Sequence, residues 1–324
     1  MRVPARFSGG YSQHRISGPV SRSDSVTSVN EHLTDRYPTR GSSEVVMPRT
    51  DPVVWSEPGA PGPVGAADLA RYEREGFLCV DALLTPAEVT DCRRELARLA
   101  ADPGLRADGR AVVEPESDAV KSIFEPHKVS AVFDDLVRDP RVVDRARQVL
   151  GSEVYLHQFR VNMKPGFGAS GWYWHSDFET WHAEDGLPAP RTLSLSLALT
   201  DNEDTNGSLM IMPGSHKTFL GCAGATPEDN YKTSLQNQGA GLPSDAAVAR
   251  FAGEQGIRLC TGAAGSAVMF DSNCMHGSSD NITPFPRCNA FIVFNSVHNT
   301  TVEPFAAPAR RPEYLGSRDF TPVR

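Results

Sequence analysis

The chain has 324 residues, of which 40% are hydrophobic and 22% are charged, as in an ordinary soluble globular protein. No stretch approaches the ~20 apolar residues that a membrane-spanning helix needs, and a formal net charge of −8 argues against nucleic acid as a main partner. The six cysteines form no C-x-x-C pair, so we expect reduced thiols and a cytoplasmic location.

The first 50 residues differ in composition from the rest of the chain. They are rich in Ser, Arg, Gly and Pro and show no apolar periodicity, which predicts a mostly disordered N-terminal arm over residues 1–50. Residues 51–324 are then expected to form a single domain.

Three helices are expected after this arm. Thr85-Pro86-Ala87-Glu88 opens the second as a capping box with Pro at the first helical position, and Asp139-Pro140 opens the third. A glycine closes the first and the third, at Gly76 and Gly151. The expected spans are residues 66–75, residues 86 to about 100, and residues 140–150.

After Gly151 the hydrophobic period changes from about 3.6 to 2, the period of a strand. Leu193, Leu195 and Leu197, for example, point one way, while the residues between them point the other way. Helices followed by short alternating strands predict a mainly β fold with flanking helices, an antiparallel sandwich or barrel. The expected strands are residues 155–163, 191–200, 208–212, 266–270 and 287–295.

The stretch Trp174-His175-Ser176-Asp177 contains the most informative pattern in the chain. On an extended segment, residues i and i+2 face the same side, so His175 and Asp177 can both reach one ion. Two histidines and one carboxylate form the facial triad that binds Fe(II). A single H-x-D triplet also arises by chance, so a hydrogen-bonded pair on a surface loop is the competing interpretation.

Four histidines are candidates for the remaining ligand. His182 lies too close in sequence to return from another strand, and His216 lies in a turn that would rather support the site. His298 has no downstream Arg at a useful spacing. His276 lies between two expected strands, so we expect it to complete the triad.

Arg287 begins the strand that follows His276. Its planar fork can bind a carboxylate bidentately, and strand alternation places Asn289 and Phe291 on the same face. A cosubstrate that chelates iron at one end and carries a carboxylate at the other needs this arrangement. Ser278 can add a hydroxyl.

The segment Trp172–Pro188, WYWHSDFETWHAEDGLP, resembles the signature segment of the ectoine hydroxylases within the phytanoyl-CoA dioxygenase superfamily. The similarity continues through residues 209–216 and 275–278 and covers the chain from about Asp35 onward. The resemblance implies a double-stranded β-helix, a cupin-like jelly roll flanked by helices. It also implies a homodimeric dioxygenase that uses Fe(II), O2 and 2-oxoglutarate to hydroxylate ectoine to 5-hydroxyectoine, with release of succinate and CO2.

Transferred position by position, the resemblance assigns three groups of residues. The catalytic iron ligands are His175, Asp177 and His276. The 2-oxoglutarate anchor is Arg287, with Ser278 as a helper. The substrate pocket is assigned to Gln158, Asn162, Thr180, Trp181, Phe270, Asn289 and Phe291.

Ectoine is a small ring with a delocalised amidinium and a carboxylate, and the assigned pocket suits it. Aromatic faces from Trp181 and Phe291 can hold the cationic ring by cation–π contact, worth roughly 0.5–2 kcal/mol. Gln158 can meet a ring N–H or the carboxylate. For Trp181 and Phe270, packing in the core is the competing interpretation.

Two other functions stay open. One is an oxygenase of the same superfamily that acts on another small amino-acid-like molecule, which a test of substrate-dependent succinate formation distinguishes. The other is a non-catalytic barrel that only binds a small molecule, which predicts a missing ligand or anchor. Halogenation is disfavoured, because that chemistry requires halide in place of the carboxylate ligand and Asp177 is present.

Overall fold

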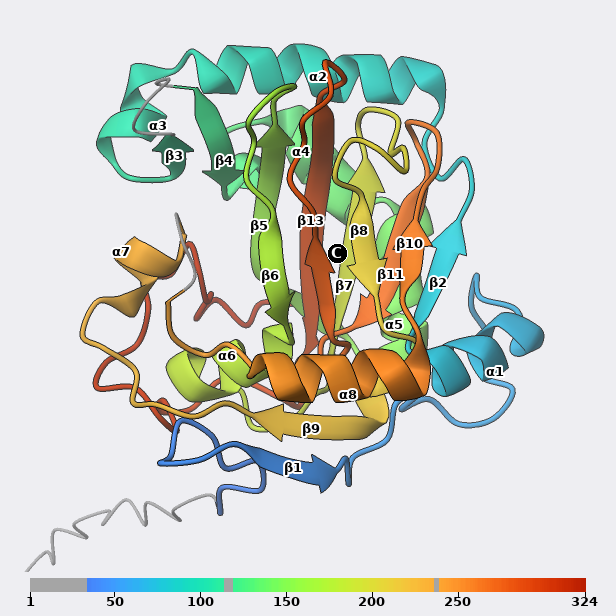
Figure 1. The fold of residues 1–324 in the computed structure, drawn as a ribbon. Helices are drawn as coiled ribbons and strands as arrows, with labels where there is room; N and C mark the ends of the chain where they lie inside the picture. Colours follow the sequence, from blue (N-terminus) through green and yellow to red (C-terminus); the bar gives the residue numbers. More distant parts are fainter. Residues whose placement is uncertain (1–33, 114–118, 236–238) are drawn as a thin grey trace, which may run out of the picture. The chain divides into compact units, whose positions relative to one another are not determined.

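The alternating strands form two antiparallel sheets in the computed structural model, which describes residues 34–113, 119–235 and 239–324. Within this part of the chain, the larger sheet has the strand order β2-β11-β7-β13-β5-β4-β3 and the smaller sheet the order β10-β8-β12-β6 (Figure 1). The chain alternates between the two sheets from β5 to β8 and again from β10 to β13, with β9 outside both. This is the topology of a double-stranded β-helix, as expected.

The strands of the larger sheet are β2 (Phe77–Val80), β3 (Ala111–Val113), β4 (Val120–Phe124), β5 (Val154–Lys164), β7 (Thr192–Ala198), β11 (Ala267–Asp271) and β13 (Arg287–Ser296). Those of the smaller sheet are β6 (Trp172–His175), β8 (Leu209–Ile211), β10 (Arg258–Cys260) and β12 (His276–Ser278). A separate pair consists of β1 (Val45–Pro48) and β9 (Thr218–Gly221).

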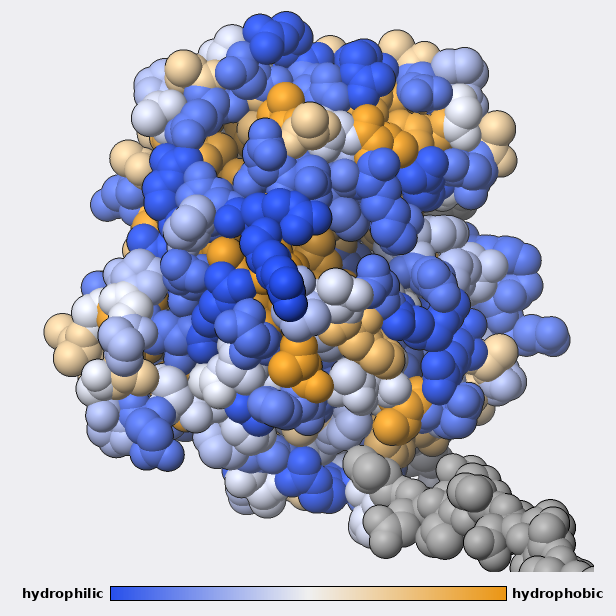
Figure 2. All heavy atoms as spheres, turned by 180° about the vertical axis from the view of Figure 1, so that it is seen from behind, coloured by the Kyte–Doolittle hydropathy of each residue, from blue (hydrophilic) through white to orange (hydrophobic). Residues whose placement is uncertain are grey.

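The helices lie around these sheets, with α2 along one end of the larger sheet and α5 packed on β5, β7 and β13 (Figure 1). Their spans are α1 (Ala66–Glu75), α2 (Pro86–Ala100), α3 (Pro103–Ala107), α4 (Ala131–Arg138), α5 (Pro140–Leu150), α6 (Asp177–Asp185), α7 (Asn230–Ser234) and α8 (Asp245–Gln255). In the described residues, every helix is too short or too polar to cross a membrane. The face opposite to that of Figure 1 is mostly hydrophilic, with small apolar areas between the polar side chains (Figure 2).

The predicted helix ends are confirmed where local chemistry defines them. The side chain of Thr85 accepts a hydrogen bond from the backbone N–H of Glu88, and Glu88 accepts one from the N–H of Thr85, which completes the capping box of α2. Gly76 ends α1 with a left-handed φ of 83°. A side chain there would also collide with the His216 ring, because a Cβ would lie 2.4 Å from its Nδ1.

Strands β7 and β13 show how alternation builds the core. On the face toward the helices, Leu195 and Ile292 belong to the main hydrophobic cluster. On the opposite face, Asn289 donates a hydrogen bond to the Ser196 hydroxyl at 3.1 Å, and Arg287 lines a cavity. Every residue of both strands is buried. The polar inner face is therefore the lining of an internal site and not a solvent-exposed surface.

Residues 35–50 are part of the folded body and not of a disordered arm. Strand β1 pairs with β9 in antiparallel register, and Tyr37 and Arg40 are buried. Residues 35–324 together form one compact unit. The expected arm boundary after residue 50 is therefore wrong for this segment, while residues 1–33 lie outside the described residues.

Long-range ion pairs hold this segment in place. Arg40 donates two hydrogen bonds to Glu179, at 2.6 and 2.9 Å, and Arg49 pairs with Asp271 at 2.7 Å. All four charged side chains are at most 2% exposed. Contacts of this kind leave no apolar periodicity in the sequence, which is why the segment resembled a disordered arm.

Two truncations separate the arm from the body. Removal of residues 1–34 leaves these contacts intact, whereas removal of residues 1–50 leaves Glu179 and Asp271 buried without their Arg partners. Breaking a buried pair costs ~3–5 kcal/mol, so we expect the longer truncation to be insoluble or to melt far below the full chain. The shorter truncation should melt within a few degrees of the full chain in scanning calorimetry, and equal losses in both would contradict this account.

Candidate metal centre and pocket

The two histidines of the expected triad lie on neighbouring strands. β6 ends at His175 and β12 begins at His276, and the antiparallel register places these residues directly opposite one another. Their ring centroids are 4.2 Å apart. Asp177 follows as the first residue of α6, so all three side chains meet where a strand gives way to a helix.

The expectation that His175 and Asp177 share one extended segment needs a correction. Asp177 belongs to α6, and only Ser176 between the two ligands keeps an extended backbone, with φ −111° and ψ 130°. Ser176 is the N-cap of α6, a position that normally has non-helical backbone angles. Its side chain accepts a hydrogen bond from the N–H of Glu179 at 3.2 Å. The cap therefore keeps the two ligands on the same side.

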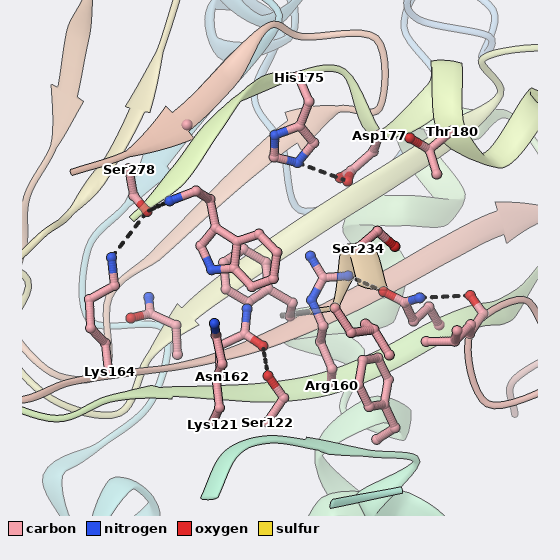
Figure 3. Close-up of a pocket in the computed structure, with 18 of the residues that line it drawn as sticks. Lys121, Ser122, Arg160, Asn162, Lys164, His175, Asp177, Thr180, Ser234 and Ser278 are labelled. Atoms are coloured by element: carbon pink, nitrogen blue, oxygen red, sulfur yellow. Dashed lines mark hydrogen bonds and ion pairs between the residues drawn. The ribbon is translucent and has the colours of Figure 1, made fainter. Parts of the chain in front are cut away.

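Backbone carbonyls fix the tautomer of both imidazoles. His175 Nδ1 lies 2.7 Å from the carbonyl of Tyr173, and His276 Nδ1 lies 3.0 Å from that of Cys274. Since a carbonyl can only accept, each Nδ1 carries the proton and each Nε2 has its lone pair free. Both Nε2 atoms face Asp177, at 3.8 and 3.9 Å from its two carboxylate oxygens (Figure 3 shows His175 beside Asp177).

This donor set fits a divalent metal ion. One ligand atom from each of His175, Asp177 and His276 lies within 4.8 Å of the others, and two neutral imidazoles with one carboxylate suit Fe(II). Burial and the neighbouring His276 lower the pKa of His175 to about 4. The ring is therefore neutral at physiological pH, which metal binding requires.

A cavity that opens to solvent lies next to the triad. All but one of the residues that the sequence assigned to cosubstrate and substrate line it: Gln158, Asn162, Thr180, Trp181, Ser278, Arg287, Asn289 and Phe291. Figure 3 shows polar residues of the lining converging from three elements, among them Ser122 of β4, Asn162 of β5 and Thr180 of α6. The fold therefore gathers residues that are far apart in the sequence into one pocket.

Phe270 is the exception, because it is absent from the described lining of the cavity, and its expected place in the substrate pocket stays a prediction. Its side chain is fully buried in a hydrophobic cluster with Phe77 and Ile211. Its ring lies 5.0 Å from the His276 ring. Phe270 thus packs against a metal ligand, a position that also agrees with the competing interpretation as a core residue.

One end of the cavity is built to bind a carboxylate. The register of β13 and β5 places Arg287 opposite Lys164, and the ammonium of Lys164 donates to the Ser278 hydroxyl at 3.2 Å. Arg287 donates to the carbonyl of Gly207 at 2.7 Å, while its buried Nε has no partner in the described structure. Burial of two cations side by side is unfavourable unless an anion joins them.

The pKa values of this pair reflect its environment. Burial and the charge of Arg287 lower the pKa of Lys164 to about 7. Burial alone lowers the pKa of Arg287 to about 10. A dicarboxylate bound here would relieve both penalties, so 2-oxoglutarate fits the unpartnered guanidinium nitrogen and the lysine.

The other end of the cavity carries a second set of cations. Arg160 lies over the Phe291 ring at 5.1 Å from its centroid and donates to the side-chain oxygen of Gln158. The amide nitrogen of Gln158 donates to the carbonyl of Leu315 at 2.6 Å. Arg311 also lines the cavity and, like Gln158, donates to the carbonyl of Leu315, at 3.4 Å. Among the described residues, the cavity is lined by five cationic side chains and two carboxylates, which are Lys121, Arg160, Lys164, Arg287 and Arg311, and Asp177 and Glu184. The excess of positive charge favours the binding of an anionic group.

Sequence reasoning missed Arg160, Lys164 and Arg311. The first two were within reach, because they continue the polar face of β5 that contains Gln158 and Asn162, at intervals of two residues. Arg311 had no such signal. It lies in a C-terminal segment without helix or strand, and only the fold brings it to the cavity.

A double-stranded β-helix that holds two histidines and one carboxylate beside a cationic pocket has the structure of a non-haem, metal-dependent oxygenase. Comparison with known families agrees with this class. The chain belongs to the phytanoyl-CoA dioxygenase family, whose model matches residues 72–289.

Several curated relatives are named ectoine dioxygenase. The protein from Streptomyces coelicolor is 68% identical over 299 residues, which cover 92% of this chain and 100% of the relative. The protein from Nocardia farcinica is 58% identical over 290 residues, which cover 89% of this chain and 95% of the relative.

Solved structures show the same similarity. The crystal structure of EctD from S. alaskensis with 2-oxoglutarate and 5-hydroxyectoine superposes with a TM-score of 0.81 at 41% identity, covering 90% of this chain and 97% of that one. The structure of the same protein with bound Fe gives the same score and identity.

Substitution of Asp177 tests the metal centre. Asp177→Ala removes the only anionic ligand of the triad, so we expect loss of bound iron and of turnover. Metal analysis after anaerobic loading with Fe(II) measures the first, and product formation the second. Glu184→Gln, which changes a carboxylate in the same cavity outside the ligand set, should keep its iron. A folded Asp177→Ala protein with the iron content of the unsubstituted enzyme would contradict the assignment.

Proposed function

We propose that this chain is an Fe(II)- and 2-oxoglutarate-dependent dioxygenase that hydroxylates ectoine to 5-hydroxyectoine, with release of succinate and CO2. The observation that carries the proposal is the position of the His175–Asp177–His276 triad beside the Arg287–Lys164 pair in one cavity. The triad binds the metal, and the cation pair binds the far carboxylate of the cosubstrate. The ectoine dioxygenases that are 58–68% identical to this chain support the choice of substrate.

The residues of the chain hold the two reactants side by side. Arg287 presents its unpartnered Nε and Lys164 its ammonium to the carboxylate of 2-oxoglutarate, and Ser278 supplies a hydroxyl. Bound iron(II) with O2 supplies the oxidising chemistry, in which 2-oxoglutarate is decarboxylated and one C–H of the substrate becomes C–OH. The protein contributes orientation, because a substrate held in one pose presents one C–H to the metal.

Ectoine occupies the opposite end of the cavity in this proposal. Its carboxylate faces Arg311 and Arg160, the cations at that end, and its ring lies against Trp181. Thr180 and Asn162 complete the wall. The side-chain amide of Gln158 is already hydrogen-bonded to Arg160 and to the carbonyl of Leu315. In this proposal Gln158 therefore orients Arg160 and makes no hydrogen bond of its own to the ectoine ring.

The aromatic clamp expected between Trp181 and Phe291 needs revision. The guanidinium of Arg160 already lies over the Phe291 ring. This face of the ring therefore makes its cation–π contact with Arg160 and not with the cationic ring of ectoine. Trp181 is 2% exposed and contacts His157 edge-on, with centroids 5.1 Å apart. The proposal therefore assigns ring contact to Trp181, and to Phe291 the support of Arg160.

One experiment tests the function directly. Protein loaded anaerobically with Fe(II) and 2-oxoglutarate is exposed to O2 with ectoine, and 5-hydroxyectoine and succinate are measured by mass spectrometry. We expect the two products in near-equal amounts. If succinate forms with another small amino-acid-like molecule and not with ectoine, that molecule is the substrate and ectoine is not. If no candidate molecule gives succinate, the protein is better described as a non-catalytic barrel.

The proposal also includes a cytoplasmic homodimer. The six cysteines are unpaired, as expected in a reducing compartment, and the dimer follows from the family resemblance. Sedimentation velocity at micromolar concentration measures the oligomeric state.

Lys164 makes the binding of 2-oxoglutarate pH-dependent. With a pKa of about 7 in the free protein, it is charged below that pH, and a bound carboxylate raises the pKa by favouring the charged form. Affinity for 2-oxoglutarate should therefore be constant below pH 7 and fall as the pH rises above 7, by up to about tenfold per pH unit. Lys164→Arg stays charged and should flatten the profile in anaerobic titration calorimetry. The same slope in both proteins would assign the titration to another group.

Trp181 separates binding of the substrate from binding of the cosubstrate. Trp181→Ala should abolish ectoine hydroxylation while Fe(II) and 2-oxoglutarate still bind, because neither site contacts the indole in the proposed pose. A purely structural Trp would instead destabilise the protein by roughly 3–5 kcal/mol and impair all three together. Melting temperature, cosubstrate binding and product formation on this one variant distinguish the outcomes. Normal hydroxylation by a stable variant would rule out the contact.

A further inference from the structure

The C-terminal segment from Arg311 to Arg318, here called the C-terminal strap, brings Arg311 to the cavity. It contains neither helix nor strand, so other parts of the chain must hold it. The backbone N–H of Ser317 donates to the carbonyl of His157 at 2.9 Å, and the carbonyl of Leu315 accepts from Gln158 at 2.6 Å. Arg318 donates to the carbonyl of Arg311 at 3.1 Å.

Asp185, the last residue of α6, binds Arg311 directly. Arg311 donates from Nε and Nη2 to the two carboxylate oxygens of Asp185, at 2.8 and 2.6 Å. The side chain of Asp185 is 3% exposed and that of Arg311 is 9% exposed. Burial alone would raise the pKa of Asp185, but the Arg311 guanidinium and the His157 ring hold it below its ordinary value. The carboxylate is therefore ionised and the pair is charged.

A histidine fixes the carboxylate from the other side. His157 Nε2 lies 3.1 Å from Oδ2 of Asp185, and it must be the donor because an ionised carboxylate can only accept. The strap also abuts this carboxylate, since a Cβ on Gly316 would lie 2.6 Å from Cγ of Asp185. Asp185 thus has little freedom to move, and neither has the guanidinium that it holds.

Only one edge of the Arg311 guanidinium, formed by Nε and Nη2, contacts Asp185. Asp185 takes Nε and Nη2, Nη2 also donates to the carbonyl of Leu315 at 3.4 Å, and none of these hydrogen bonds of the described residues uses Nη1. Arg311 lines the cavity, so this free edge is available to a carboxylate of the substrate. Asp177, Trp181 and Asp185 recur every four residues in α6 and therefore share one helix face. This spacing connects the metal ligand, the indole of the substrate pocket and the partner of Arg311.

We propose that Asp185, steadied by His157, is a positioning residue for the substrate: it aims the free edge of Arg311 at the carboxylate of ectoine. The inference rests on the proposed function and extends it to a residue that touches neither the metal nor the substrate. One helix then sets the distance between the metal, through Asp177, and the anchor of the substrate carboxylate, through Asp185.

A second buried pair on the same helix provides a matched control. Glu179 binds Arg40 with the same bidentate geometry, at 2.6 and 2.9 Å, and with side chains 2% and 1% exposed. Arg40 is absent from the described lining of the cavity. Glu179→Gln therefore reproduces the structural cost of losing such a pair without reaching the substrate anchor.

The test compares steady-state kinetics of Asp185→Asn, Glu179→Gln, Arg311→Ala and the Asp185→Asn/Arg311→Ala double variant. We expect Asp185→Asn to raise the KM for ectoine by about tenfold or more, the value of one charge-assisted hydrogen bond. The KM for 2-oxoglutarate and the iron content should stay within about twofold. Glu179→Gln should lower the melting temperature comparably and leave the KM for ectoine unchanged. In the Arg311→Ala background, Asp185→Asn should add nothing further.

Three outcomes would overturn the proposal: an unchanged KM for ectoine in Asp185→Asn, an equal rise in Glu179→Gln, or a full additional rise in the Arg311→Ala background. If Asp185→Asn is insoluble, His157→Phe takes its place. That variant keeps an aromatic ring against Trp181 and removes only the hydrogen bond to Asp185, so it should raise the KM for ectoine alone. No change there would equally refute the idea. Failure of the unsubstituted protein to hydroxylate ectoine would refute the proposed function instead.

Discussion

The register between β6 and β12 is the constraint on which the site depends. It places His276 directly opposite His175, and the other edge of β12 is held by β8. A slip of one residue would turn one imidazole to the far face of the sheet, because neighbouring residues in a strand alternate. The separation of the two rings is therefore a property of the sheet, and the cavity residues of β5 and β13 are placed relative to it.

Helix α6 connects this metal centre to the rest of the cavity. All its residues except Thr180 are buried, although three of its carboxylates are not metal ligands. Buried carboxylates are costly unless they are paired, and each has a partner from a distant part of the chain: Glu179 has Arg40, Glu184 has Asn230 and Asp185 has Arg311. One short helix therefore contacts the N-terminal segment, α7 and the C-terminal strap.

Sequence patterns predicted the parts that local chemistry determines. The capping box at Thr85, the leucine alternation of β7 and the His175–Asp177 pair depend on neighbours or on fixed spacing. His276 was selected among four histidines by its place between two expected strands, and the pairing of β12 with β6 brings it to the site. Patterns could not predict α6 as a helix, because burial on all sides removes the 3.6-residue periodicity of an amphipathic helix. They also missed Arg311, since long-range packing alone decides whether a side chain faces the cavity or the core.

The two faces of β13 have a consequence for how such proteins diversify. Ala290, Ile292 and Phe294 belong to the hydrophobic core, while the alternate positions Arg287, Asn289 and Phe291 line the cavity. Mutations at Arg287 and Asn289 can change what is bound without altering the main hydrophobic cluster, whereas Phe291 also packs in a second hydrophobic cluster. A strand that separates folding from recognition, residue by residue, gives natural selection a way to change the substrate while the scaffold is retained.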